Sequence, residues 1–108
     1  MYGLKQQTIE AIRGIFSHHP SIEKVILYGS RAQGNYRNGS DIDLTLVGEQ
    51  LTLNEQLAID NELDELLLAY KIDLSIYHTI ENKDLIDHIK RVGKVFYTSG
   101  IDSTVAGK

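Results

Sequence analysis

The sequence predicts an α+β domain of two layers, in which a mixed sheet of about four strands packs against helices. Four short runs, rich in β-branched or aromatic residues and bounded by turn residues, are typical of strands; they cover residues 25–28, 42–47, 71–77 and 94–97. Three segments with apolar residues at helical spacing are typical of amphipathic helices; they cover residues 4–17, 53–69 and 83–92. The chain of 108 residues is long enough for one domain with its own core.

Cap and turn residues predict where the helices begin and end. Pro20 stops the first helix, because proline cannot continue it and the residue before proline avoids helical backbone angles. Thr52 and Glu55 have the spacing of a capping box that opens the second helix. Asn82 is typical of an N-cap for the third helix, and Gly93 is typical of its stop signal.

Two groups of ionisable residues resemble metal sites but are interpreted as structural. His18 and His19 are neighbours in the sequence and so rarely converge on one ion, whereas histidine near a helix C-terminus suits the helix dipole. The acidic side of the helix over residues 53–69 is interpreted as a solvated face. It carries Glu55, Asp60, Glu62, Asp64 and Glu65.

Composition indicates an ordinary soluble protein and argues against several classes. We expect a folded domain over residues 1–97 and a small, polar, flexible tail over residues 98–108. The chain has no apolar run of the ~18 residues that a membrane helix needs, and no secretory signal at Met1. The absence of cysteine excludes disulfides and fits a cytoplasmic protein. The 11 basic and 15 acidic residues argue against direct nucleic-acid binding, which usually uses a basic face.

The stretch from Val25 to Val47 carries the candidate chemistry. Asp41 and Asp43 lie two apart at the start of a strand, so their side chains leave the same face with Cα atoms about 6.6 Å apart. Carboxylates at this distance can share cations, and phosphoryl-transfer sites hold paired divalent ions roughly 3.5–4 Å apart. Gly29 and Ser30 follow the preceding strand. The glycine lets a phosphate approach the backbone, and the N–H groups that open the next short helix point toward it.

The spacing also predicts how the strands pair. For Ser30 and Asp41 to reach one ligand, the strands that carry them must be antiparallel. The ten residues between them suit this pairing, because a parallel crossover with its helix needs at least ~10–12 residues. The later strand starts at Lys71, after a predicted helix long enough for a parallel crossover. A parallel strand there brings Asp73 beside Asp41 and Asp43.

The same residues also have a purely structural interpretation. A Gly-Ser step or an Asp-x-Asp pair alone is a weak signal. Each could also belong to a β-hairpin with a long polar loop and a pair of surface aspartates. Together, with each at a strand end, they indicate a functional site. Three carboxylates this close repel one another without a cation, which makes them poor structural choices. Arg31 stays open between a phosphate contact and an ordinary surface residue.

The motif resembles that of a known superfamily. Gly29-Ser30, ten residues and Asp41-Ile42-Asp43 resemble the signature of the nucleotidyltransferases related to DNA polymerase β. The surrounding letters, YGSRAQG and GSDIDL, are most similar to the minimal nucleotidyltransferases (MNT). The resemblance covers nearly the whole chain, because Asp73 falls where the family has its third carboxylate. It implies the nucleotidyltransferase fold, Mg²⁺ bound by the three aspartates, and nucleotide phosphates at Gly29 and Ser30.

The resemblance also implies a partner and an activity. Such chains are commonly paired with a helical HEPN protein that acts as an RNase toxin, while the MNT chain acts as an antitoxin that can transfer AMP to it. We therefore expect Mg²⁺-dependent transfer of AMP from ATP to a hydroxyl of that partner, which by the same analogy is that of a tyrosine. The catalytic core uses up the chain, so we expect a hetero-oligomer in which the partner selects the acceptor.

Two alternatives remain at this point. The chain could neutralise its toxin by binding alone, with no needed catalysis. It could instead be a small-molecule nucleotidyltransferase of the antibiotic-modifying type, against which the absence of an acceptor domain argues.

Overall fold

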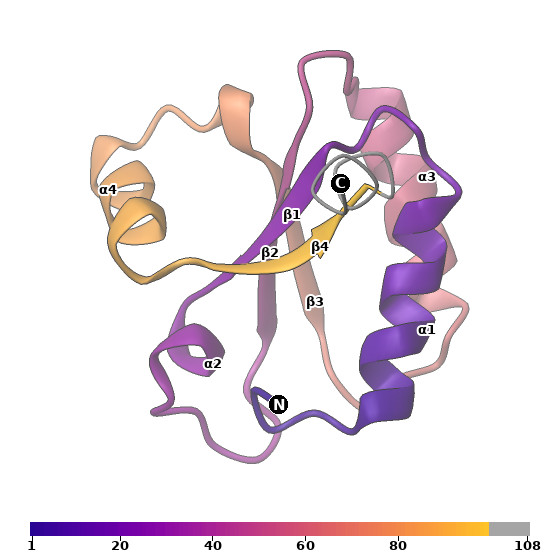
Figure 1. The fold of residues 1–108 in the computed structure, drawn as a ribbon. Coiled ribbons are helices and arrows are strands. Elements are labelled where there is room, and N and C mark those ends of the chain that lie inside the picture. The colour runs from indigo at the N-terminus through magenta and orange to yellow at the C-terminus, as the bar shows by residue number, and fades with distance from the viewer. Residues whose placement is uncertain (100–108) are drawn as a thin grey trace, which may run out of the picture.

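A four-stranded mixed sheet organises the fold, which the computed structural model describes over residues 1–99 (Figure 1). The strands are β1 (Lys24–Tyr28), β2 (Ile42–Val47), β3 (Ile72–Ile76) and β4 (Lys94–Thr98). Their order across the sheet is β3-β2-β1-β4. β1 runs antiparallel to β2 and β4, and β3 runs parallel to β2. The predicted fold class and both predicted pairings, antiparallel for β1 with β2 and parallel for β2 with β3, are confirmed.

Helices lie on both sides of this sheet. They are α1 (Gln6–Ser17), α2 (Ser30–Gln33), α3 (Leu53–Asp64), the short 3₁₀ helix η1 (Tyr77–Thr79) and α4 (Lys83–Val92). α1 and α3 lie side by side against one face, and α4 lies on the other side near β1 (Figure 1). Within residues 1–99 no helix is both long enough and apolar enough to cross a bilayer. The expected cytoplasmic location stays a prediction.

The main core lies between the sheet and the pair α1 and α3. Alternate residues of β1 and β2 face it, because successive side chains of a strand point to opposite faces. Its fully buried members include Ile9, Ile12, Phe16, Val25, Leu27, Ile42, Leu44, Leu46 and Ile59. Each such side chain contributes about 1.5–3 kcal/mol when buried. This core fixes the sheet and leaves its opposite face to carry polar side chains.

The second long helix is shorter than predicted. α3 ends at Asp64 rather than at residue 69. The amides of Leu66 and Leu67 bond to carbonyls three residues back, which tightens the last turn, and Leu67 adopts a left-handed φ of 54°. The apolar spacing beyond Asp64 arises because Leu66 and Leu68 pack against the core from a turn. Helical periodicity alone could not distinguish that arrangement from a continued helix.

The predicted caps are confirmed in their main contacts. The Thr52 hydroxyl accepts the Glu55 amide at 3.2 Å, and the Asn82 side chain accepts the amides of Asp84 and Leu85 at 2.9 and 3.2 Å. These bonds satisfy amides that a helix leaves unpaired at its start.

The acidic face of α3 is not wholly solvated, contrary to the prediction. The ring of His19 lies between two of its carboxylates, 3.3 Å from Glu55 and 3.1 Å from Glu62. The contact ties the α1–β1 connection to α3. His18, in contrast, caps α1 and is exposed.

The first residue of the predicted tail belongs to the sheet. Thr98 ends β4, and the Ser99 amide donates to the Glu23 carbonyl at 3.0 Å. The rest of the predicted tail, residues 100–108, lies outside the described residues.

Candidate active site

Two of the predicted carboxylates face one another across neighbouring strands. Asp43 on β2 and Asp73 on β3 are register partners in the parallel pair. Adjacent strands lie about 4.8 Å apart, so the two side chains leave the same face as neighbours. Asp41 immediately precedes β2 and is exposed, whereas Asp43 is half-buried.

Burial and neighbouring charge both disfavour the ionised form of Asp43. Burial, followed by the charges of Asp73 and Asp41, raises the pKa of Asp43, while His88 acts in the opposite direction. The ion pairs found among the described residues do not involve Asp41, Asp43 or Asp73.

The donor set fits a hard divalent cation. Mg²⁺ prefers carboxylate, phosphate and water oxygens, and the facing pair offers carboxylate oxygens only. Within residues 1–99, however, no three acidic or histidine side chains converge closely enough to form a complete metal site. The structure brings Asp43 and Asp73 together and leaves Asp41 beside them, so the three-aspartate ligand set stays a prediction.

Gly29 packs directly against Asp43. Its backbone angles, φ 77° and ψ −158°, belong to a region open almost only to glycine. A Cβ atom at this position would overlap the carboxylate of Asp43. The end of β1 and the start of β2 can approach only because residue 29 has no side chain. Ser30 follows as the first residue of α2. The contact with Asp43 is thus shown for Gly29, the first member of the predicted phosphate-binding step.

His88 joins this group, although the sequence analysis did not select it. Its Nε2 accepts the backbone N–H of Gly29 at 3.2 Å, and its ring meets Tyr28 edge-on at a centroid distance of 6.1 Å. One signal could have found it: position 88 lies three residues after Leu85 and one before Ile89, on the inward face of α4. A histidine on an apolar helix face that packs over a predicted site is a candidate member of that site.

Tyr28 and Ser75 continue the polar face behind the aspartates. Burial raises the pKa of the Tyr28 phenol, a hydrogen bond with Ser75 lowers it, and the charges of Asp43 and Asp73 raise it further. The Ser75 hydroxyl in turn donates to Thr45 at 2.8 Å. This network links β1, β2 and β3 on the face of the sheet that carries Asp43 and Asp73.

Arg31 is not an ordinary surface residue, so that alternative is wrong. Its side chain is 3% exposed. Nε and Nη2 donate to the Ser40 carbonyl at 3.1 and 2.9 Å, and Nη1 donates to the Tyr2 carbonyl at 2.9 Å. The guanidinium lies 5.2 Å from the ring centroid of Tyr36 and 4.9 Å from that of Tyr70. A phosphate contact by Arg31 stays a prediction.

Comparison with known proteins agrees with this geometry. The family model described as polymerase β nucleotidyltransferase matches residues 10–101. The chain belongs to this family. The predicted enzyme class, nucleotidyltransferase, is thereby confirmed.

A curated relative supports the same assignment. This nucleotidyltransferase is 37% identical over 75 residues to a protein of Methanocaldococcus jannaschii named "Putative protein adenylyltransferase MJ0141". The match covers 67% of this chain and 76% of the relative.

Solved structures share the fold. A toxin–antitoxin structure with AMP-PNP matches with a TM-score of 0.68 at 20% identity, and covers 94% of this nucleotidyltransferase and 80% of that chain. The toxin–antitoxin pair MntA–HepT matches with a TM-score of 0.65 at 17% identity, over 94% and 79% of the two chains. A tri-AMPylated HEPN toxin of Shewanella oneidensis in complex with its MNT antitoxin also matches, with a TM-score of 0.65, 17% identity and the same two coverages. These matches confirm the nucleotidyltransferase fold.

Proposed function

We propose that this nucleotidyltransferase transfers AMP from ATP to a hydroxyl of a partner HEPN toxin and acts as its antitoxin. The observation that carries the proposal is the pairing of Asp43 with Asp73 beside Gly29. It joins carboxylates that suit a cation to a backbone position that a phosphate can approach.

Each group has a role in this proposal. Gly29 and Ser30 receive the triphosphate, and Asp41, Asp43 and Asp73 would hold Mg²⁺. When bound, the ion supplies charge neutralisation for the triphosphate and for the departing pyrophosphate. The acceptor oxygen bonds to the α-phosphorus as the bond from that phosphorus to pyrophosphate breaks. The acceptor proton passes to Asp73, which acts as general base. The protein mainly positions the reactants, as is typical of phosphoryl transfer.

The names of the similar proteins support the choice of acceptor. The M. jannaschii relative is named an adenylyltransferase of proteins. One structurally similar antitoxin was captured with AMP-PNP, and another with a HEPN toxin that carries three AMP groups. We infer by analogy that the acceptor here is a HEPN protein, and that it supplies a tyrosine hydroxyl.

Neutralisation by binding alone remains the second candidate. The fold match to toxin–antitoxin complexes favours it as much as it favours transfer, because a stable complex also blocks a toxin. A small-molecule acceptor is the third candidate, and no observation on this chain favours it.

One labelling experiment separates the three. The chain is incubated with Mg²⁺, the proposed HEPN partner and ATP labelled at the α-phosphate, and the products are separated by mass. Label on the HEPN protein that disappears with Asp43→Asn supports transfer. The matched control is Asp87→Asn, which removes an exposed carboxylate paired only with Arg91. Neutralisation without label that survives Asp43→Asn would support binding alone, and label found only on small molecules would support the third candidate.

A further inference from the structure

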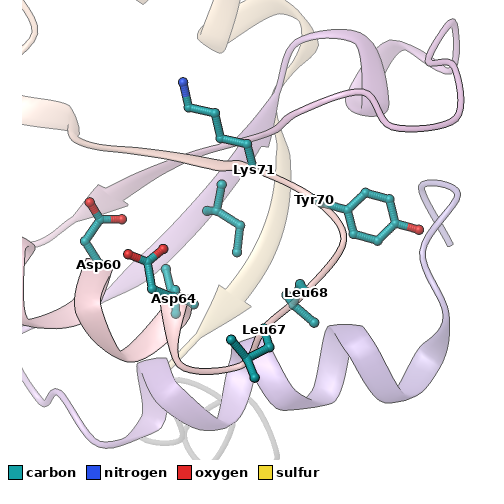
Figure 2. Close-up of a pocket in the computed structure, with 8 residues that line it drawn as sticks. Asp60, Asp64, Leu67, Leu68, Tyr70 and Lys71 are labelled. Atoms are coloured by element: carbon teal, nitrogen blue, oxygen red, sulfur yellow. The ribbon is translucent and has the colours of Figure 1, made fainter.

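The turn between α3 and β3 forms a groove of about 360 Å³ beside the candidate site (Figure 2). We define the α3–β3 groove by its lining residues Asp60, Asp64, Leu67, Leu68, Tyr70 and Lys71. Figure 2 shows Asp60 and Asp64 together on α3, with Leu67 and Leu68 on the turn that follows. We propose that this groove binds the partner segment that presents the acceptor hydroxyl, a segment with an apolar side chain next to lysine or arginine. The inference rests on the proposed function.

The position of the groove matches the acceptor side of the site. Gly29 lies at the end of β1, so a triphosphate bound there occupies the β1 side of β2. Asp73 lies on β3, at the other side of β2, and β3 is the last strand at that edge of the sheet. The β3 edge is therefore one side from which an acceptor can reach Asp73 without crossing the triphosphate. The groove lies at that edge on the α3 side of the sheet, where Ile72 lines it. The side chain of Asp73 leaves the other face together with Asp43, so a segment bound in the groove would reach Asp73 around β3.

The groove and the site also interact electrostatically. Burial, followed by the charges of Asp64 and Asp73, raises the pKa of Asp60. The groove has two acidic residues and one basic residue, Lys71, among those that define it. Its carboxylates and Asp73 thus form one negative region. A partner segment with lysine or arginine complements this charge, and such complementarity steers association as well as fixing register.

The apolar requirement comes from Leu67. This side chain is 89% exposed and sits on a backbone with φ 54°. A leucine in the left-handed region costs roughly 1–2 kcal/mol, and strained positions of this kind cluster where proteins bind ligands. A left-handed residue commonly ends a helix, so the φ of Leu67 follows from the end of α3, while its side chain is left exposed. An apolar side chain of the partner segment that packs on Leu67 would remove this exposed apolar surface from water.

Two variants test the groove, each with a matched control. Leu67→Asn removes the apolar surface with a residue that tolerates the left-handed backbone, and Leu53→Asn does the same to a leucine that is 65% exposed on α3 outside the groove. Asp64→Asn removes a groove carboxylate, and Glu65→Gln removes the exposed carboxylate next to it. None of these residues belongs to the proposed catalytic set.

The measurements are transfer kinetics and binding without ATP. We expect Leu67→Asn and Asp64→Asn to raise the KM for the HEPN protein by about tenfold each, with kcat and the KM for ATP unchanged and both controls like wild type. Calorimetric titration of the HEPN protein onto each variant, without nucleotide, should show the same weakening. If binding weakens in the groove variants while wild type transfers no label, the groove stands and the proposed function fails. Unchanged KM and binding in both groove variants, or equal effects in the controls, would overturn the groove.

Discussion

The guanidinium of Arg31 donates two hydrogen bonds to the carbonyl oxygen of Ser40, the residue before Asp41. The bonds tie α2 to the start of β2, and the contact with Tyr70 extends the tie to the chain before β3. One buried cation thus connects the segments that carry the predicted phosphate-binding step and the carboxylates. These contacts favour a positioning role for Arg31.

Replacing Arg31 should therefore lower both stability and activity. Arg31→Met leaves the carbonyls of Ser40 and Tyr2 without their donor, and we expect the free energy of unfolding to fall by about 2–3 kcal/mol in urea titrations. Arg31→Lys keeps the charge but lacks the planar guanidinium with its several donors, so its free energy of unfolding should lie between those of Arg31→Met and wild type. Arg37→Met, at an exposed position, serves as the control and should change stability by less than about 0.5 kcal/mol. A positioning role also predicts that Arg31→Lys raises the Mg²⁺ concentration needed for half-maximal transfer. A rise confined to the KM for ATP would indicate a phosphate contact instead.

Asp43→Asn should stabilise the metal-free protein while it abolishes transfer. Burial and the charges of Asp73 and Asp41 raise the pKa of Asp43, so the folded state holds this proton more tightly than the unfolded chain. The resulting stability is present below the unfolded pKa and is lost as the pH rises through the folded pKa. At neutral pH the ionised carboxylate therefore opposes folding, and thermal melts without metal should give Asp43→Asn the higher Tm.

The pH dependence of that difference checks its cause. The difference in Tm between Asp43→Asn and wild type should decrease as the pH falls from the raised folded-state pKa of Asp43 toward its unfolded value near 3.8. Mg²⁺ should also reduce it, because a cation relieves the same repulsion. An advantage that is constant with pH would rule out the repulsion as its source.

Gly29→Ala should be more harmful than the same change at Gly34. Gly34 lies in the left-handed region, where an alanine costs roughly 1–2 kcal/mol. Gly29 has backbone angles that disfavour alanine still more, because they belong to a region open almost only to glycine. A Cβ at Gly34 has open space, whereas one at Gly29 overlaps Asp43. We expect Gly34→Ala to lose only this backbone energy and to keep activity. Gly29→Ala should lose more stability in denaturant titrations and reduce the transfer rate by about a hundredfold. Equal losses in both variants would mean that the contact with Asp43 is unimportant.

His88→Ala should weaken nucleotide binding and loosen the end of β1. The variant leaves the Gly29 amide without its acceptor, which should cost about 1 kcal/mol in unfolding experiments. We expect a higher KM for ATP and a clear shift of the Gly29 amide resonance in NMR spectra. His78→Ala, at an exposed position on η1, is the control. An unchanged Gly29 resonance in His88→Ala would contradict the contact.

The elements of the site that follow local rules could be predicted from the sequence. Strand alternation and the lengths of the connections were enough to place Asp43 and Asp73 on neighbouring strands. The caps at Thr52 and Asn82 follow from side chains that bond to nearby amides. These features depend on residues close in the chain or on the general handedness of crossovers.

Features that depend on tertiary packing could not be predicted. The end of α3 at Asp64 is set by how Leu66 and Leu68 meet the core, which periodicity does not encode. His88 reaches Gly29 across 59 positions, and Arg31 bonds to Tyr2 across 29. The sequence indicated Arg31 because it lies inside the motif. Its burial and its hydrogen bonds to the carbonyls of Ser40 and Tyr2 became visible only in the structure.

The central claim is that Asp43 and Asp73 act as one unit in AMP transfer, and a double-variant comparison of transfer rates tests it most directly. The account predicts that Asp43→Asn and Asp73→Asn each reduce labelling of the HEPN protein to background at saturating ATP and Mg²⁺, and that the double variant is no worse, because residues of one unit are not additive. Labelling by Asp73→Asn at the wild-type rate would contradict it.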